Sequence, residues 1–176
     1  MVGLRKGTCY RRMEKPYTRK SKYKKKNFIR TIPPHKIARF EMGNKEKLVN
    51  ATHLVKMVSE GSLQIRSNSL ESARLIVNRN FEAKTGTNYF LRLNVFPHHA
   101  LRENKMLGGA HADRLQTGMA HSFGKVVAMA AQVKKGTPIF IAWVDKSGIQ
   151  AAKEAMEKGG PKLPGKVSVS IEEFKH

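Results

Sequence analysis

The pattern of apolar and polar positions predicts alternating strands and helices over residues 35–176. A short strand is expected at residues 38–42, where apolar side chains occupy every second position. Residues 53–58 and 63–66 are strand-like and flank the turn sequence Ser-Glu-Gly-Ser. Two strand-like runs around such a turn predict a β-hairpin.

A helix is predicted next, with Asn68 as its N-cap and Glu71 three positions later, as in a capping box. Arg74 is expected on its solvent face beside Glu71, and the sequence around Gly86 ends it. Its buried face is expected to consist of Leu70, Ala73, Val77 and Phe81. In the strand that follows, the residues expected on one face are Tyr89, Leu91, Leu93 and Val95.

The same order of elements recurs in the second half of the chain. Residues 125–133 predict a strand with Val127 and Met129 on a shared face. Residues 139–144 form a continuous apolar run that suits a buried strand.

Ser147–Lys158 predicts a second helix, with Glu154 and Lys158 as an ion pair and Gly159 as the C-cap. Residues 167–171 then alternate again as a strand. The repeated order of elements, offset by about 75–78 residues, indicates one α+β domain. Its antiparallel sheet should carry two packed helices.

The balance of charge points to a polyanionic partner. The 176 residues include 34 Lys and Arg against 13 Asp and Glu, for a net charge of +21. Residues 1–39 contain fourteen of these bases and one acid, Glu14. We interpret residues 1–34 as a basic RNA-binding extension that adds little to the core and is mobile in isolation, and residues 35–176 as the domain.

Nucleic acid is favoured over an anionic membrane because the extension shows no amphipathic helix. A localisation tag or a solvated tail is the plain alternative. No apolar run is long enough for a transmembrane helix, no secretory signal is expected, and the single cysteine, Cys9, excludes an internal disulfide. These features predict a reduced, intracellular protein.

In the extension, Lys and Arg side chains would neutralise phosphates, and tyrosine rings would stack on unpaired nucleobases. The predicted RNA-binding residues are Arg5, Lys6, Tyr10, Arg11, Arg12, Lys15, Tyr17, Arg19, Lys20, Lys22, Lys24, Lys25, Lys26 and Arg30.

Residues 97–124 predict a long, glycine-rich loop between the two halves, and structureless loops of this length are usually functional. Its basic and apolar side chains suit a groove in folded RNA or a protein partner. A metal-dependent RNA-processing enzyme using His98, His111 and Asp113 is the alternative, although no motif with metal-ligand spacing supports it. Residues 160–166 have the glycine spacing of a phosphate-binding loop but lack its Ser/Thr, so we expect no NTPase activity there. No catalytic constellation is visible in the sequence, and we expect no enzyme activity, cofactor or metal.

Several segments resemble the universal large-subunit ribosomal protein sixteen family, called ten-e in archaea and eukaryotes. The matching segments are Cys9–Arg11, Lys15–Thr18, Phe40–Asn44, Asn104–Leu107, Ala112–Met119, Phe123–Lys125 and Pro164–Lys166. The resemblance covers nearly the whole chain and favours the archaeal branch. Two positions depart from the family pattern: Ala120 stands where the family usually has Arg, and Val126 where Pro or Ile is common.

The resemblance implies a non-catalytic, cytoplasmic component of the large ribosomal subunit with a hammerhead-like α+β fold. Such a protein binds large-subunit rRNA near the aminoacyl-tRNA site, close to the five-S rRNA and neighbouring ribosomal proteins. Its central loop points toward the peptidyl transferase centre and the tRNA acceptor arm. The loop residues that this places there are Lys105, Met106, His111, Asp113, Arg114, Gln116, Met119, His121 and Lys125.

Overall fold

The computed structural model of the protein describes residues 5–13, 23–26, 29, 31–103 and 124–174. Its strands form a large antiparallel sheet with the order β1-β4-β7-β2-β8 and a small antiparallel sheet with the order β3-β6-β5. The strands are β1 (Glu41–Gly43), β2 (His53–Ser59), β3 (Leu63–Arg66), β4 (Phe90–Leu93), β5 (His99–Glu103), β6 (Lys125–Val133), β7 (Pro138–Val144) and β8 (Val167–Glu173).

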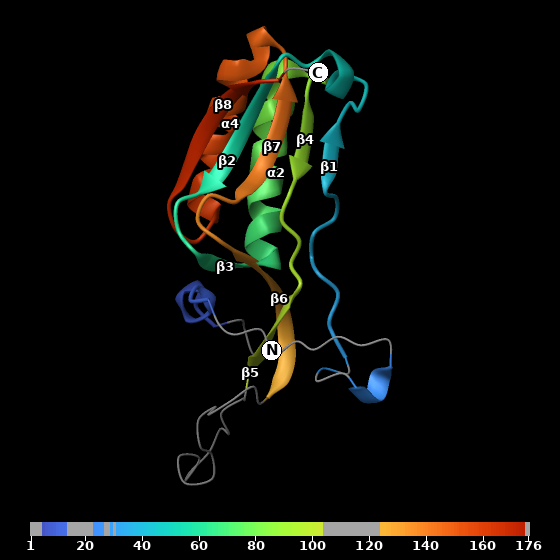
Figure 1. Cartoon of the computed structure of the whole chain (residues 1–176), viewed down its shortest axis with the longest axis vertical. Coiled ribbons are helices and arrows are strands. Elements are labelled where there is room, and N and C mark those ends of the chain that lie inside the picture. Colours follow the sequence, from blue (N-terminus) through green and yellow to red (C-terminus); the bar gives the residue numbers. More distant parts are fainter. Residues whose placement is uncertain (1–4, 14–22, 27–28, 30, 104–123, 175–176) are drawn as a thin grey trace.

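The two long helices, α2 (Ser67–Thr85) and α4 (Ile149–Gly159), pack on one face of the large sheet and lie behind it in Figure 1. The small sheet extends from one end of the molecule, and the single-turn helix α1 (Lys47–Asn50) lies at the other end. The 3-10 turns are η1 (Gly7–Tyr10), η2 (Lys24–Lys26), η3 (Lys146–Gly148) and η4 (Gly160–Lys162). The predicted α+β class is confirmed, although the strands form two sheets rather than one. Within the described ranges, no helix is long and apolar enough to cross a membrane.

The core lies between the helices and the large sheet, and the helical periodicity predicted its α2 face correctly. The four residues of that face are fully buried: Leu70, Ala73, Val77 and Phe81. They pack against Val55 and Met57 of β2 and Leu91 of β4 in one apolar cluster.

The predicted β-hairpin at residues 53–66 is wrong. Both strands form, but β2 pairs with β7 and β8 in the large sheet, whereas β3 pairs with β6 in the small sheet. The backbone at Ser59 and Glu60 bonds to Thr137, Gly136 and Lys166 rather than closing a hairpin with β3. The chain therefore crosses from one sheet to the other at this turn.

The first predicted strand is shorter than expected, because only Glu41–Gly43 pair with β4. Upstream of it, the Ala38 amide donates to a Glu71 carboxylate oxygen on α2 (3.2 Å). The carbonyl oxygen of Phe40 accepts from the Leu93 amide (2.7 Å). A side-chain acceptor thus replaces part of the expected strand ladder.

Helix α2 begins at Ser67, with Arg66 at the N-cap position and no side-chain cap, so the predicted Asn68 capping box does not form. Glu71 accepts from Nε (2.8 Å) and Nη2 (2.5 Å) of Arg74 instead. Arg74 is buried, against the prediction, and its Nη1 lies 3.2 Å from the Met42 sulfur. The ion pair makes this burial possible, because an unpaired guanidinium would be strongly destabilising there.

We expect Glu71→Gln to lower the free energy of unfolding by about 1.5–3 kcal/mol at neutral pH. The hydrogen bonds from Arg74 lower the pKa of the Glu71 carboxyl, burial opposes this, and the Ala38 amide adds to the lowering. A lowered folded-state pKa contributes stability above the ordinary value of 4.5, and that contribution is lost as the pH falls through the folded value.

Urea unfolding at pH 7 and about pH 3 checks this prediction, because the difference between variant and parent should shrink in acid. The control is Glu41→Gln, whose exposed pair with Lys45 (2.7 Å) is screened by solvent and should contribute much less to stability. An equal effect of both variants would contradict the role assigned to the buried pair.

Strand β6 spans Lys125–Val133 as predicted, but its expected shared face is wrong. The register with β5 shifts between Leu101 and Arg102, which leaves Val127 without a partner residue opposite it. Val127 and Met129 consequently pack in different apolar clusters. A β-bulge of this kind turns neighbouring side chains to new directions.

Helix α4 begins at Ile149, after the 3-10 turn that contains Ser147. Gly159 is its last residue and Gly160 is the C-cap, so the predicted cap is one residue early. Gly159 has a different use: a Cβ there would lie 2.5 Å from Cγ2 of Val77 on α2. The glycine permits the close approach of the two helices.

Charged residues of α4 bond to α2 rather than forming the predicted pair within α4. Glu154 accepts from Lys84 of α2. The Lys158 ammonium donates to Oδ1 of Asn80 (3.1 Å). Both contacts tie the two helices together across their polar edge.

Candidate nucleic-acid interface

The beginning of the basic extension is held against the small sheet by buried polar groups of β3. Nε2 of Gln64 donates to the carbonyl oxygens of Tyr10 (3.1 Å) and Arg12 (2.7 Å), and its backbone amide donates to that of Arg11 (2.9 Å). Gln64 is only 1% exposed, and its own Oε1 accepts from Gln132 (2.9 Å). Nε2 and the backbone amide of Gln64 thereby hold the extension, while Oε1 ties Gln64 to Gln132 of β6.

Tyr10 is an anchor of the extension, contrary to the prediction that it stacks on RNA. Its ring is 8% exposed and packs with Leu101 and Ala130 of the small sheet. The Arg66 guanidinium lies over the ring, 5.4 Å from its centroid. With these contacts in place, Tyr10 has no ring face open to a base.

Ile29 is a second anchor, which the sequence did not predict. It is 8% exposed and packs with Ala100 of β5 and Met129 of β6. Ile32 and Val126 are partly buried against the same cluster. The extension therefore contributes to the core at two places among its described residues, whereas composition indicated almost none.

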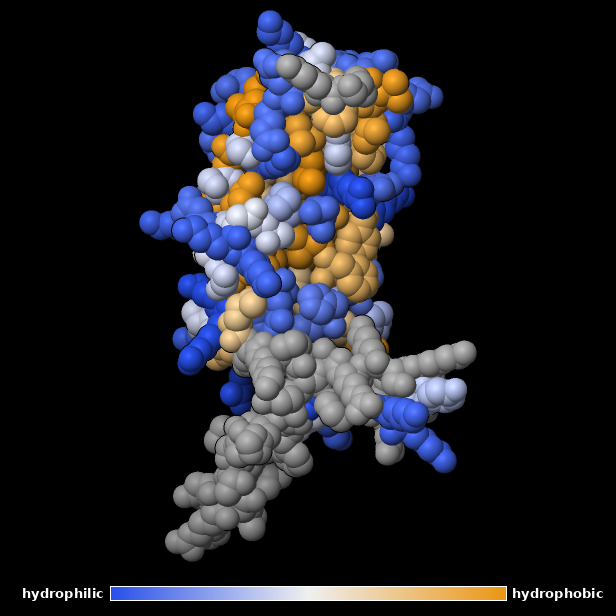
Figure 2. Space-filling model, in the orientation of Figure 1, coloured by the Kyte–Doolittle hydropathy of each residue, from blue (hydrophilic) through white to orange (hydrophobic). Residues whose placement is uncertain are grey.

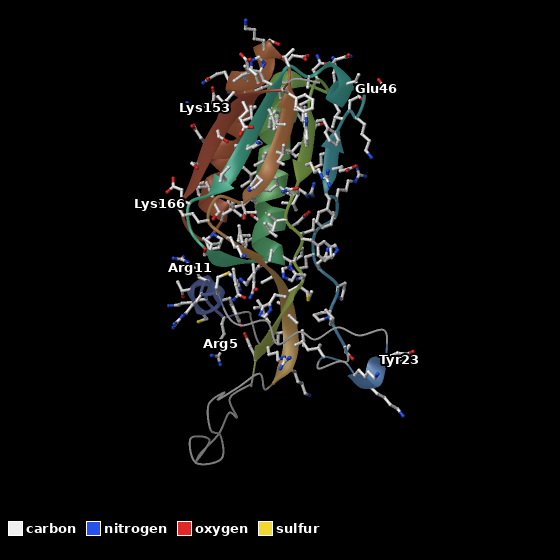
Figure 3. All side chains as sticks on the ribbon, in the orientation of Figure 1. Arg5, Arg11, Tyr23, Glu46, Lys153 and Lys166 are labelled. Carbon is white, nitrogen blue, oxygen red and sulfur yellow. The ribbon has the colours of Figure 1, made fainter. Side chains whose placement is uncertain are left out.

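Four predicted phosphate ligands lie beside the first anchor with their side chains exposed: Arg5, Lys6, Arg11 and Arg12. In Figure 3, Arg5 and Arg11 lie near the small sheet, whereas Glu46 and Lys153 lie at the opposite end of the molecule. Because the backbone of these cations is already fixed, binding a phosphate would order only the side chains.

Lys25 and Lys26 are exposed on η2, and Lys24 belongs to the same turn. Beside them Tyr23 is 62% exposed, with the Lys26 ammonium 5.2 Å from its ring centroid. Tyr23 follows the same pattern of aromatic rings between basic residues that predicts stacking on RNA, although it is not among the predicted binding residues. The predicted residues Lys15, Tyr17, Arg19, Lys20, Lys22 and Arg30 lie outside the described residues.

The start of the predicted loop is a strand instead. Residues 99–103 form β5, which pairs with β6 so that Glu103 stands opposite Lys125. Residues 104–123 thus connect the paired ends of a two-stranded arm, which points away from the large sheet (Figure 1). Lys125 is exposed at this end. Outside the described residues lie Lys105, Met106, His111, Asp113, Arg114, Gln116, Met119 and His121.

The histidines that begin this region differ in environment. His98 is exposed, with Nδ1 3.2 Å from the carbonyl oxygen of Phe96. His99 is 4% exposed, and burial lowers its pKa, with smaller contributions from His98 and Arg102. In the part of the chain that the structure describes, no three His, Cys, Asp or Glu residues lie together as a metal site would require.

Comparison with known proteins gives one consistent family. Residues 14–170 match the family described as ribosomal protein L16p/L10e. The chain is 42% identical over 172 residues to large ribosomal subunit protein uL16 of Thermofilum pendens, covering 97% of this chain and 98% of that protein. It is 40% identical over 164 residues to uL16 of Archaeoglobus fulgidus, covering 93% and 90% respectively. It is also 40% identical over 164 residues to uL16 of Methanococcus maripaludis strain C5, covering 93% and 91%.

Proposed function

Because the chain belongs to the ribosomal protein L16p/L10e family, we propose that it binds large-subunit rRNA near the aminoacyl-tRNA site. It is a structural, non-enzymatic component of the large ribosomal subunit in the cytoplasm, and its sequence is of the archaeal type. In the finer proposal, residues 97–124 extend toward the peptidyl transferase centre and the acceptor arm of bound tRNA. The extension, residues 1–34, lies in rRNA close to the five-S rRNA.

One observation carries this proposal: the anchored cations and both ends of the 104–123 segment share the small sheet. Tyr10 and Ile29 pack on β5 and β6, the two strands from which residues 104–123 emerge. Cations that hold the extension on rRNA would therefore also fix the direction of the arm. A rigid arm is what delivers a loop to a site distant from the body of a protein.

The proposal predicts a separation between assembly and translation. We expect replacement of Lys105–His121 by a Gly/Ser segment of equal length to leave the large sheet folded, since the described core lies outside it. Most rRNA affinity should also remain, because it is assigned to the extension and body. Large subunits that contain this variant should accommodate aminoacyl-tRNA slowly.

The measurement is single-turnover accommodation of aminoacyl-tRNA by reconstituted subunits, with incorporation of the variant checked by sedimentation. A matched control replaces the turn Lys134–Gly136 between β6 and β7, on the side of the small sheet nearer the body. Full accommodation rates with the loop replaced would overturn the placement of the loop at the tRNA. If the loop variant failed to co-sediment with large subunits, the loop would be needed for assembly, which would contradict its assignment to tRNA contact alone.

A further inference from the structure

Three rings form a small surface cluster at the junction between the two sheets. Phe40 and Phe96 stack with their centroids 5.5 Å apart and their planes 24° apart. The His35 ring meets both edge-on, at 5.6 Å from Phe40 and 5.2 Å from Phe96. We call Phe40, Phe96 and His35 the aromatic platform. Figure 2 shows hydrophobic surface at this height, on the side where residues 31–40 run in Figure 1.

One ring of the aromatic platform packs against the core, and another is exposed to solvent. Phe40 is partly buried against the main core, and its carbonyl oxygen accepts from the Leu93 amide (2.7 Å). Phe96 is 51% exposed, although a phenyl ring at a surface is usually covered. Since Phe40 occupies one face of the Phe96 ring, the exposed half of Phe96 includes the opposite face.

Polar groups that can read a base edge stand beside Phe96. Residues 93–98 alternate between buried and exposed, so Asn94 and His98 share the exposed side with Phe96. The imidazole of His98 uses Nδ1 on the Phe96 carbonyl oxygen (3.2 Å), which leaves Nε2 for an incoming group. Nδ2 of Asn94 donates to the Pro138 carbonyl oxygen (3.4 Å), so Oδ1 is the Asn94 atom that can accept from a base. An aromatic face with an amide oxygen and an imidazole next to it has the components of a nucleobase site.

The charge around the platform favours RNA. Lys36 and Arg39, adjacent in sequence to His35 and Phe40, are exposed. Two acids lie beside this segment: Glu71 is bonded to Arg74 (2.8 Å), and Glu41, which follows Phe40, is paired with Lys45 (2.7 Å). Both carboxylates are thus already paired, which leaves Lys36 and Arg39 for a phosphodiester backbone.

We propose that the aromatic platform binds one unpaired nucleotide of the rRNA, with its base stacked on the free face of Phe96. Lys36 and Arg39 hold the flanking phosphates. The proposal rests on the rRNA-binding function above and adds a second contact on the body of the protein, separate from the extension and from residues 104–123. It names a site that the charge pattern of the sequence does not reveal.

The first test places a fluorescent indole on the platform of the full-length chain. The variant is Phe96→Trp combined with Trp143→Phe, which removes the chain's one natural tryptophan. It is titrated with a ten-nucleotide oligoadenylate and with an abasic ribose-phosphate strand of the same length. Stacking predicts quenching by the oligoadenylate and little by the abasic strand.

The matched control is Leu75→Trp in the same Trp143→Phe background, because Leu75 is 54% exposed on the outer side of α2. Quenching at position 96 only supports the platform. Equal quenching at both positions, or by the abasic strand, would overturn it, since binding would then be a general effect of the basic extension.

The second test measures the affinity of Phe96→Ala and Phe96→Leu for large-subunit rRNA. Both variants should lose about 5-fold or more, because leucine is apolar but offers no ring to stack on. If both variants kept full affinity for rRNA, base stacking on the aromatic platform would be refuted. The proposed function would be unaffected, because the extension would still bind rRNA. Loss with alanine but not leucine would indicate apolar contact with a neighbouring protein and would equally refute it.

Discussion

Neutralising the anchored cations should weaken rRNA binding about 100-fold at 50 mM salt, with a slope of log affinity against log salt less negative by about 3 to 4. The four substitutions to glutamine are at Arg5, Lys6, Arg11 and Arg12. Each exposed cation that contacts a phosphate releases a counterion, so each contributes roughly one unit or slightly less to the slope. Folding should be unchanged, because the side chains are exposed while their backbone is held by Gln64 and Arg66.

Filter binding to large-subunit rRNA at several salt concentrations measures both quantities. The control carries four substitutions to glutamine at exposed lysines of the body: Lys146, Lys153, Lys162 and Lys166. Its net charge equals that of the first variant, so a difference between the two reports position rather than charge. If the control lost as much affinity and slope, the RNA would not be using the extension in particular.

Substitution is a sharper experiment than deleting residues 1–34. The composition of the extension indicates that its removal leaves the body intact. Tyr10 and Ile29, however, cover Leu101, Ala130 and Met129 of the small sheet. Deletion would expose this apolar surface and leave Gln64 without its acceptors. A loss of RNA binding could then reflect a disturbed small sheet as well as lost cations.

Periodicity predicted the elements that bury one regular face. Leu70, Ala73, Val77 and Phe81 recur at helical spacing and are all fully buried in α2. The buried strand at residues 139–144 was equally predictable, because β7 lies between β4 and β2 in the large sheet. In both cases the pattern follows from what the element itself buries: one face of α2, and a strand at the centre of the sheet for β7.

Strand pairing was not predictable, because it depends on residues far apart in the chain. The turn after Ser59 is compatible with a hairpin, yet β2 pairs with β7, and Met57 stands opposite Phe140. The stacking of Phe40 on Phe96 joins two segments whose spacing in sequence carries no signal. Local pattern describes what a strand buries and leaves open which strand it joins.

The residues of the candidate site were also predictable only in part. Composition identified the cations of the extension, because charge excess is visible without any structure. It could not separate Tyr10, which packs, from Tyr23, which is 62% exposed, since each stands between basic residues. Gln64 gave no signal at all, because an isolated glutamine in a strand is usually a surface residue.

Phe81→Ala should lower the free energy of unfolding by about 3–5 kcal/mol, the largest effect expected of a single substitution here. Phe81 is fully buried, and its ring stacks on Tyr89 with centroids 4.7 Å apart. Alanine would leave a cavity between α2 and β4 and remove this ring contact. The hydroxyl of Tyr89 donates to Asn78 (2.9 Å), which limits how far Tyr89 can move to fill the cavity.

The matched control is Phe96→Ala, which makes the same chemical change at a side chain that is 51% exposed. Its cost should stay below about 1 kcal/mol, since little apolar surface returns to water. Urea unfolding of both variants provides the comparison, with the Phe81→Ala melting temperature on the order of 10 °C lower. A large loss for Phe96→Ala would mean that the platform supports the fold, and its effect on RNA binding would then have to be measured below the melting temperature of the variant. A small loss for Phe81→Ala would show that the α2 face repacks around the missing ring, against the rigid core described above.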